Sequence, residues 1–191
     1  DPFLQGNQYV LSSGYNDVLN YSEDGVMGYV EIPDIDVNLP IYHGTSEEVL
    51  QRGAGHLEAS SLPIGGEGTH SVISAHRGLP SAKLFTDLDE MEVGDIFYIH
   101  ILDETLAYQV DQIETVLPDE LDLLRVIEGR DLVTLLTCTP YAVNTHRLLV
   151  RGTRIPYEEA EEIQEEDGDA GTISAWLREY LLSIIAGVVL L

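Results

Sequence analysis

The sequence predicts a mainly β domain, either a sandwich or a closed barrel, with a few short helices inserted between strands. Two observations support this fold class. From residue 28 to about residue 157, short runs rich in β-branched and aromatic residues alternate with turn-forming residues, which is typical of sandwiches and barrels. Helical patterns are confined to a few short stretches. The 191 residues are enough for one such domain with a core of its own.

The elements follow from where the apolar runs begin and end. Strands are expected, in chain order, at residues 28–32, 35–41, 71–75, 96–102, 106–117, 132–138 and 146–155. Short helices are expected at residues 46–52, 82–90 and 121–128. We therefore divide the chain into four regions, which are an N-terminal lid-like arm and helix (residues 1–20), the β domain (21–157), an acidic linker or helix (158–175) and a hydrophobic C-terminal segment (176–191).

The two C-terminal regions differ sharply in composition. Residues 158–169 are mostly acidic but lack the alternation of oxygen ligands and glycine that forms a calcium loop, so no metal site is expected. Trp176 and Tyr180 precede residues 181–191, which are apolar except for Ser183. Aromatic residues of this kind favour a membrane interface, and a span needs about 20 apolar residues. We expect the start of a transmembrane helix that is cut off by the end of the chain; the alternative is a core or amphipathic helix.

The charge of the chain restricts its partners. It carries 34 acidic and 9 basic residues, a formal net charge of −25. Phosphate binding requires a basic surface, so nucleic acid is not expected as a partner. A peptide that presents a lysine is compatible with this field, although acidity also serves solubility alone.

Cys138 is the single cysteine, so the chain has no intrachain disulfide. Such a thiol is either reactive or a small buried hydrophobic group. The strand that contains it must end near Cys138, because Pro140 cannot donate a ladder hydrogen bond. Arg147 begins the next strand. If the two strands pair as antiparallel neighbours, a permanently charged donor lies beside the thiol, where it suits a developing oxyanion.

An acid or base is needed beside such a thiol, and His76 is the strongest candidate among six histidines. It ends a predicted strand and is followed by a turn signal, Arg-Gly-Leu-Pro. His100 lies within a strand and is interpreted as structural, while His146 alternates away from Arg147. His43 and His56 lie in turn regions and are interpreted as solvated.

Two long segments carry a family resemblance. Residues 134–152, which begin Thr-Leu-Leu-Thr-Cys, resemble the active-site segment of class C sortases, the pilus-assembly members of a family of cysteine transpeptidases. Residues 74–80, Ser-Ala-His-Arg-Gly-Leu-Pro, and their continuation to residue 95 resemble the histidine region of the same enzymes. At the start of the chain, Asp1, Pro2 and Phe3 resemble the lid motif of that class.

The resemblance implies an eight-stranded sortase-type closed β-barrel with short helices and an N-terminal lid arm. Cys138 would attack the Thr–Gly bond of an LPXTG-type sorting signal and form a thioacyl enzyme, with His76 as general acid and then base. Arg147 would hold the oxyanion or position the peptide. Asp1 would pair with Arg147, and Phe3 would cover Cys138.

The same resemblance implies partners and a location. The acceptor would be a lysine of a pilin subunit that itself bears an LPXTG-type signal, so that pilins are polymerised. The enzyme would lie at the extracytoplasmic face of the plasma membrane of a Gram-positive cell, anchored through its hydrophobic C-terminal segment. No cofactor would be needed.

Several interpretations stay open at this stage. Thr137 and Tyr141 are candidates for contact with substrate, whereas Arg77 and Arg151 are interpreted as charges on the barrel rim. The family often has glycine where Ala142 stands and tryptophan where Phe3 stands. A sortase that attaches proteins to a peptidoglycan precursor and a non-catalytic surface scaffold are the alternatives. A papain-like protease is disfavoured because His76 precedes Cys138.

Overall fold

The computed structural model describes residues 14–20, 24–78 and 82–166 of the chain. Two compact units can be separated, one that ends at Ile155 and one that begins at Pro156. The expected lid, Asp1, Pro2 and Phe3, and the hydrophobic segment 176–191 lie outside the described residues. Within the three described ranges, no helix has both the length and the apolarity that a membrane crossing requires.

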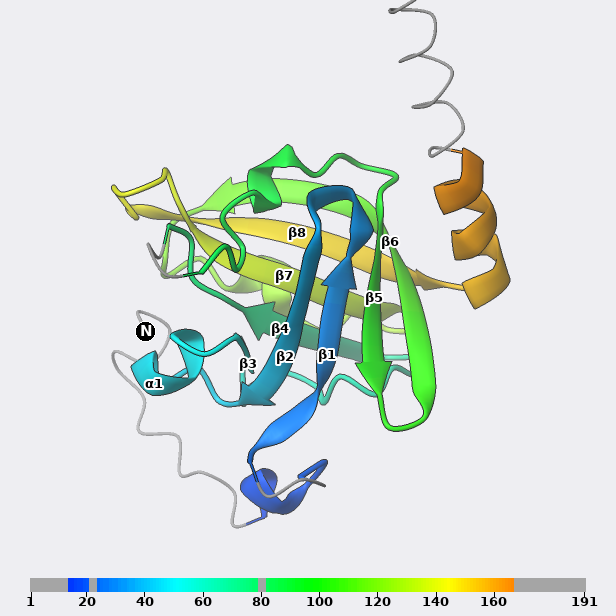
Figure 1. Cartoon of the computed structure of the whole chain (residues 1–191), viewed down its shortest axis with the longest axis horizontal. Coiled ribbons are helices and arrows are strands. Elements are labelled where there is room, and N and C mark those ends of the chain that lie inside the picture. Colours follow the sequence, from blue (N-terminus) through cyan, green and yellow to red (C-terminus); the bar gives the residue numbers. More distant parts are fainter. Residues whose placement is uncertain (1–13, 21–23, 79–81, 167–191) are drawn as a thin grey trace, which may run out of the picture. The chain divides into compact units, whose positions relative to one another are not determined.

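The first unit is an eight-stranded closed barrel, as the family resemblance implied (Figure 1). Around the barrel the strands follow the order β1-β2-β3-β4-β7-β8-β6-β5, and β5 pairs with β1 to close the ring. Their bounds are β1 Val26–Ile32, β2 Val37–His43, β3 Ala54–His56, β4 Thr69–Ser74, β5 Ile96–Ile101, β6 Glu104–Val116, β7 Asp131–Thr139 and β8 His146–Ile155.

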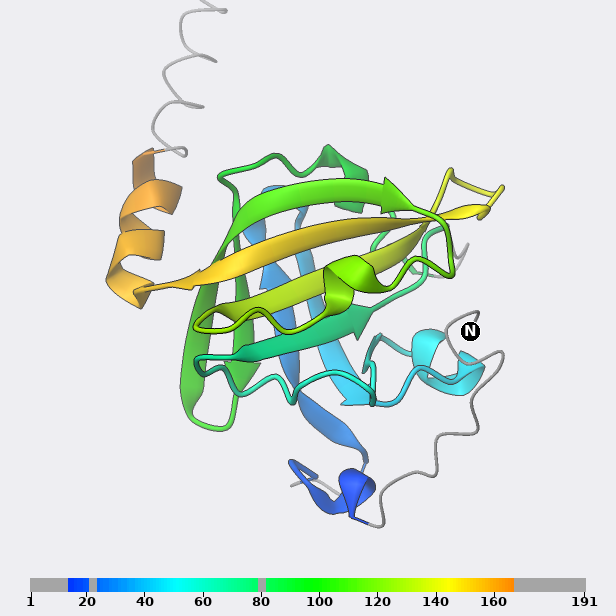
Figure 2. The ribbon, with the colours of Figure 1, turned by 180° about the vertical axis from the view of Figure 1, so that it is seen from behind.

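Two of the strand pairs are parallel, β2 with β3 and β4 with β7. A parallel pair needs a crossover, and the one between β4 and β7 contains β5 and β6, which close the far side of the barrel. Figure 2 shows β4, β7 and β8 side by side. Because β4 and β7 run in the same direction, both of their C-terminal ends lie at one edge of the barrel. This edge is where the candidate site forms.

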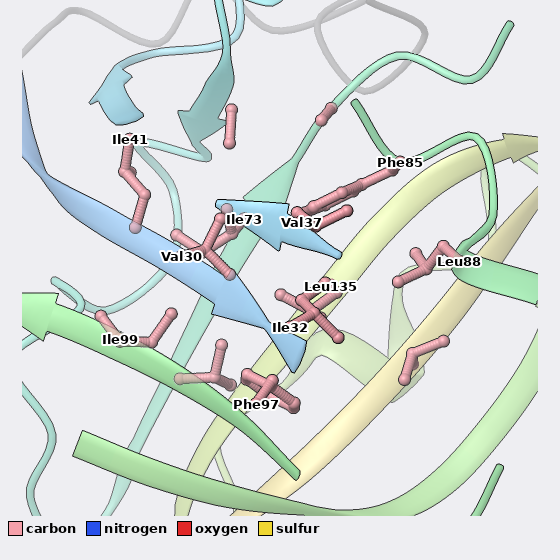
Figure 3. Close-up of a cluster of buried hydrophobic side chains, with 14 of the residues drawn as sticks. Val30, Ile32, Val37, Ile41, Ile73, Phe85, Leu88, Phe97, Ile99 and Leu135 are labelled. Atoms are coloured by element: carbon pink, nitrogen blue, oxygen red, sulfur yellow. The ribbon is translucent and has the colours of Figure 1, made fainter. Parts of the chain in front are cut away.

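The barrel is filled by side chains that alternate inward along the strands. Ile73 of β4, Leu135 of β7 and Phe97 of β5 are fully buried in this core (Figure 3). Val150 of β8 is fully buried in the same core. The residues one position away face outward and form a smaller cluster of Val72, Leu136 and Leu149, against which Leu57, Val116 and Leu124 pack. The strands therefore have a distinct inner and outer face, which decides which side chains can meet at the edge.

The seven expected strands are all present, with ends that differ by one or two residues. β3, only three residues long, was not predicted, because Ala-Gly-His carries no alternation that distinguishes it from a loop. The turn between β5 and β6 is also tighter than expected. It consists of Leu102 and Asp103, and Leu102 adopts the left-handed region with φ 55°.

Of the three expected helices, only the first is an α-helix. It is α1, Glu47–Leu50, and the Ser46 side chain accepts a hydrogen bond from the amide of Val49 at its N-terminus. The other two predictions were wrong, since the structure has only the 3₁₀ turns η4 (Leu88–Glu90) and η5 (Asp122–Leu124) there. In the 82–90 segment, Leu84 has φ 42°, which an α-helix cannot accommodate.

Three further short elements are helical, two of them 3₁₀ turns in the first unit and one a helix in the second. The 3₁₀ turns η2 (Tyr15–Asp17) and η3 (Pro33–Ile35) precede β1 and β2. In the second unit, residues 157–166 are helical. There the Tyr157 hydroxyl donates a 2.9 Å hydrogen bond to Glu161, one turn further along.

Candidate active site

Cys138 and Arg147 lie directly opposite each other on adjacent antiparallel strands, since they are register partners in β7 and β8. Side chains at opposed positions point to the same face, with Cβ atoms about 4.5–5.5 Å apart. Cys138 is partly exposed, so its thiol is not enclosed in the core. The pairing that the sequence predicted for these strands is therefore present.

The guanidinium of Arg147 is held in place by backbone carbonyls. Its Nη1 donates to the carbonyl of His146 at 2.8 Å and to that of Asn144 at 3.1 Å, and the residue is only 5 % exposed. A guanidinium carries five N–H donors in a rigid plane. The β7–β8 loop carbonyls bind only Nη1, so the planar group has further N–H donors besides those fixed by the loop.

His76 lies just past the end of β4, at the same edge of the barrel. Ser74 is the register partner of Leu136, and the amide of Ala75 donates to the carbonyl of Leu136 at 3.1 Å. Continued by two residues along both parallel strands, this register sets His76 level with Cys138. With the register extended in this way past the end of β4 at Ser74, His76, Cys138 and Arg147 form one row at the same edge of the barrel.

The row lies on the outer face of the barrel. Its members alternate in phase with the outward-facing cluster of Val72, Leu136 and Leu149 rather than with the core. On the same outer face, a small hollow is lined by residues from β6, β7 and β8 and from η5, namely Gln112, Glu114, Leu123, Thr134, Leu149 and Arg151. A chain bound along these strands would reach Cys138 at the edge.

Glu47 is a residue of this site that sequence reasoning missed. Its Oε1 lies 3.3 Å from Nε2 of His76, an ion-pair distance without hydrogen-bond geometry. The same oxygen accepts a 3.1 Å hydrogen bond from Nε2 of Gln51. This hydrogen bond, and next the charge of His76, lower the pKa of Glu47. The sequence predicted a short helix at residues 46–52, but nothing in it indicated which strand end this helix would face.

Thr137 and Tyr141, the two candidates for contact with substrate, lie in different surroundings. Thr137 is fully buried on the face opposite to Cys138, and its hydroxyl donates a 2.8 Å hydrogen bond to the carbonyl of Ala75. This geometry does not support contact with substrate and instead ties β7 to the end of β4. Tyr141 is 55 % exposed in the β7–β8 loop, which leaves the prediction for it open.

The β7–β8 loop contains two residues with positive φ, although position 142 is alanine rather than the glycine that the family often has. Ala142 has φ 62° and Asn144 has φ 60°, both in the left-handed region. Asparagine enters this region more readily than most residues. Alanine at position 142 therefore takes the conformation that glycine would adopt without strain.

The interpretation of Arg77 and Arg151 as ordinary rim charges was wrong. The side chain of Arg77 is 9 % exposed and that of Arg151 is 14 % exposed. Arg151 forms a two-pronged pair with Asp111, through Nε at 2.8 Å and Nη2 at 3.0 Å. Arg151 therefore pairs with the half-buried Asp111, and Arg77 pairs with the exposed Asp89 while its own side chain stays largely buried.

The interpretation of His56 as a solvated turn residue was also wrong. It is fully buried in β3, and its Nε2 lies 2.8 Å from the carbonyl of Ser61 while its Nδ1 lies 2.8 Å from the hydroxyl of Tyr15. Burial lowers the pKa of His56 to about 4. His100 lies in β5 and pairs with Glu31 of β1 at 2.6 Å, on a strand that is not adjacent to β4, β7 or β8 in the barrel order.

Within the described ranges, no group of three or more histidine, cysteine, aspartate or glutamate side chains is placed to hold a metal ion. The side chains at the edge offer a thiol, an imidazole and a guanidinium. A thiol can act as nucleophile, a neighbouring imidazole can transfer protons, and a fixed guanidinium can stabilise negative charge on oxygen.

A closed eight-stranded barrel with cysteine, histidine and arginine in one row at its edge is the architecture of a sortase. The Sortase domain family model matches residues 30–155, and the chain belongs to the sortase family. Sortase A of Streptococcus agalactiae serotype III (strain NEM316) is 32% identical over 129 residues, which cover 65% of this chain and 51% of that protein. The chain thus spans about half the length of this curated relative.

Solved structures of C-type sortases are more similar. Sortase C-1 from Streptococcus pneumoniae is 65% identical, with a TM-score of 0.69 over 70% of this chain and 68% of that chain. A structure described as pilus-related sortase C of Group B Streptococcus is 56% identical, with a TM-score of 0.70 over 71% of this chain and 70% of that chain.

Proposed function

We propose that the protein is a cysteine transpeptidase that cleaves an LPXTG-type sorting signal between threonine and glycine and transfers the threonine carbonyl to an amine. The observation that carries this proposal is the row of His76, Cys138 and Arg147 at one edge of a sortase barrel. Each step of an acyl transfer has a side chain in this row that can perform it.

In the first step, the Cys138 thiolate adds to the threonine carbonyl of the sorting signal. The negative charge that develops on the carbonyl oxygen is stabilised by Arg147. When the C–N bond breaks, His76 donates a proton to the leaving glycine amine, and a thioester to Cys138 remains. In the second step, an incoming amine attacks the thioester and gives its proton to His76, an amide bond forms, and the thiolate is released.

The outer face of the barrel supports a binding mode for the sorting signal. The hollow between β6, β7, β8 and η5 lies on the same face as the catalytic row. The segment of residues 117–127 contains η5, and five of its large apolar side chains are exposed, namely Leu117, Leu121, Leu123, Val126 and Ile127. We propose that the leucine and proline of the signal bind along this face and that its threonine reaches Cys138, with Tyr141 beside it.

The acceptor that we propose is a lysine of a pilin subunit, which makes the enzyme a pilin polymerase. Its high identity to C-type sortases, one of them described as pilus-related, favours this acceptor. The net charge of −25 favours an ammonium-bearing partner as well. A peptidoglycan precursor is the competing acceptor, and the lower identity to sortase A disfavours it.

Two further features belong to the proposal and concern residues outside the described ranges. We propose that Asp1, Pro2 and Phe3 form a lid over the site, in which Asp1 pairs with Arg147 and Phe3 covers Cys138. We also propose that residues 176–191 begin a membrane anchor that holds the enzyme at the extracytoplasmic surface of the cell. Removal of residues 1–3 should then speed alkylation of Cys138, and an unchanged rate would contradict the lid.

The central test is a transfer reaction followed by mass spectrometry. The chain is incubated with an LPXTG-type peptide, alone and then with a purified pilin as acceptor. We expect an adduct on Cys138 that lacks the glycine portion of the peptide and, with pilin, an amide-linked product. Absence of the adduct in the wild-type protein, or the same product from Cys138→Ala, would overturn the proposed activity.

The acceptor is tested by competition. Equal concentrations of pilin and of a peptidoglycan-type amine, such as a pentaglycine peptide, are offered to the acyl enzyme. Preferential transfer to pilin is expected. Preferential transfer to the glycine amine would assign the chain to cell-wall attachment and leave the catalytic proposal intact.

A further inference from the structure

The side chain of Arg77 links the segment that follows His76 to the strand that carries Cys138. Its Nη1 donates a 3.1 Å hydrogen bond to Oγ1 of Thr139, and its Nε donates a 3.0 Å hydrogen bond to the carbonyl of Thr86. Its Nη2 forms a 2.5 Å ion pair with Asp89. All three nitrogens of one largely buried guanidinium therefore have partners.

The positions of these contacts in the chain give them their importance. Arg77 directly follows His76, and Thr139 directly follows Cys138. One hydrogen bond thus connects the neighbour of the imidazole to the neighbour of the thiol, across two strand ends that come from different parts of the chain. The contacts with Thr86 and Asp89 anchor the same guanidinium to the segment that leads to β5.

A second contact joins the same two segments independently. The ring of Tyr141 packs over Gly78 so closely that a Cβ at position 78 would lie 2.7 Å from Cε2 of the ring. Gly78 has φ 81°, a conformation that few residues with a side chain adopt. Its amide donates to the hydroxyl of Thr86 at 3.2 Å. The segment after His76 is therefore held at its backbone as well as through Arg77.

We propose that Arg77 is a positioning residue, which fixes His76 relative to Cys138 by its hydrogen bond to Thr139. This inference rests on the proposed transpeptidase activity. Proton transfer needs His76 within hydrogen-bond reach of the reacting groups, and a displacement of about 1 Å can lower a rate by about a hundredfold. β4 ends at Ser74, before His76, so the strand ladder alone does not fix the imidazole.

Lysine cannot replace Arg77 in this role. The three partners lie in three directions that match the planar guanidinium, whereas a lysine ammonium is a compact charge on a flexible stem. We therefore expect Arg77→Lys to preserve the charge and lose the geometry. Thr139→Val removes the acceptor hydroxyl from the other side of the contact and leaves Arg77 unchanged.

The test measures acylation by an LPXTG-type peptide in a single turnover, with each rate divided by the concentration of reactive thiol from titration. Arg77→Lys and Thr139→Val should each lower this rate about tenfold or more, with the KM for the peptide changed less than about twofold. The double variant should be no slower than the slower single variant, because both remove one contact. Arg154→Lys is the matched control, since Arg154 lies over the ring of Tyr108 near the other end of β8, and it should leave the rate unchanged.

A second measurement keeps the inference testable if no acyl enzyme forms. The rate of Cys138 alkylation by iodoacetamide is followed against pH, which reports the charged groups near the thiol without any substrate. Arg77→Lys should shift the midpoint of this profile, and Arg154→Lys should not. If the wild-type protein forms no acyl enzyme but Arg77→Lys still shifts the alkylation midpoint, the proposed activity is refuted and the positioning role is not. The positioning role would be overturned if Arg77→Lys lowers the melting temperature but leaves the acylation rate per thiol and the alkylation profile the same as in wild type.

Discussion

Arg147 faces Cys138 across the β7–β8 strand pair, and backbone carbonyls of the loop between the two strands hold its guanidinium. The guanidinium is therefore already fixed, on a residue directly opposite Cys138, before any substrate arrives. Preorganised charge of this kind stabilises a transition state without reorganisation during the reaction. The relationship leads to the first prediction.

Arg147→Ala should lower the rate of acylation by about 10²–10³-fold, as the loss of an oxyanion donor does in other enzymes. Arg147→Lys should restore only part of this rate, because an ammonium lacks the planar donor array. Single-turnover acylation, monitored by mass spectrometry, measures both. Alkylation of Cys138 by iodoacetamide serves as the control for a folded site. If Arg147→Ala forms the acyl enzyme at the wild-type rate, the guanidinium has no role in the first step.

Glu47→Gln should lower the acylation rate by no more than about fivefold, because the carboxylate is largely exposed and an exposed ion pair contributes about 0.2–1 kcal/mol. The effect should shrink as salt is added, since screening weakens the attraction to His76. Glu48→Gln, which changes the next acidic residue of α1, is the matched control. A loss of the same size in Glu48→Gln would show that general charge, and not the contact with His76, is responsible.

The buried cluster of Tyr15 and His56 should make the protein sensitive to mild acid. In the unfolded chain the histidine binds a proton near its ordinary pKa of 6.5, whereas burial lowers the pKa of His56 to about 4 in the fold. Stability is therefore full above pH 6.5 and falls as the pH drops toward 4, by on the order of 3 kcal/mol at most. If Nε2–H of the neutral His56 donates to the Ser61 carbonyl, Nδ1 accepts a hydrogen bond from the Tyr15 hydroxyl. Protonation of Nδ1 would then place two donors opposite each other.

Urea unfolding at pH 7.5 and pH 5.0 measures this sensitivity. His56→Gln should be less stable than wild type at pH 7.5 but should lose less stability on acidification. His100→Gln, which changes a half-exposed histidine of β5, is the control and should retain the wild-type pH dependence. An equal loss in His56→Gln and wild type would place the sensitivity elsewhere, for example at His70, whose pKa is also lowered by burial.

Asp111 should contribute to stability at neutral pH and lose this contribution in strong acid. It is the extra residue at a bulge in β6, between Val110 and Gln112. Burial raises its pKa, but hydrogen bonds from Arg151, Arg130 and Thr153 outweigh this effect and lower the pKa to about 2. The contribution is therefore complete above the unfolded value of 3.8 and is lost as the pH falls through about 2.

Asp111→Asn should lower the free energy of unfolding at pH 7 by about 1 kcal/mol, after allowance for solvent screening. Chemical denaturation at pH 7 and at pH 3 measures the change, and the difference between variant and wild type should narrow at the lower pH. Asp103→Asn, in the β5–β6 turn, is the control. A difference that does not depend on pH would mean that the carboxylate charge is not the source of the stabilisation.

The fold could be predicted from the sequence wherever a strand-forming run is long and is bounded by turn residues. β5, β6, β7 and β8 are each at least six residues long, and their positions were predicted within two residues. β3 is too short for alternation to be visible. The segment before η4 has helix-forming residues, but tertiary contacts overrule them, because Leu84 and Phe85 are both buried and Lys83 donates to the carbonyl of Ile35.

The candidate site could be predicted in part. The pairing of Cys138 with Arg147 follows from two strands joined by a short loop, which is a local relationship. The position of His76 near the level of Cys138 depends on the parallel pairing of β4 with β7, which are about sixty residues apart in the chain. Only the family resemblance indicated that these two residues come together. Glu47 and Arg77 act through side chains whose direction depends on tertiary packing, so no pattern in the sequence indicates either contact.

The parallel pairing of β4 with β7 also bears on when the enzyme becomes chemically competent. Because β5 and β6 lie between these strands in the chain and close the opposite wall, His76 and Cys138 become neighbours only after contacts of long sequence separation have formed, which are slow to form. A chain in which the ring of strands is incomplete therefore lacks the pairing that brings His76 to the edge where Cys138 lies. For the proposed transpeptidase, acyl transfer is thus confined to molecules whose barrel is complete.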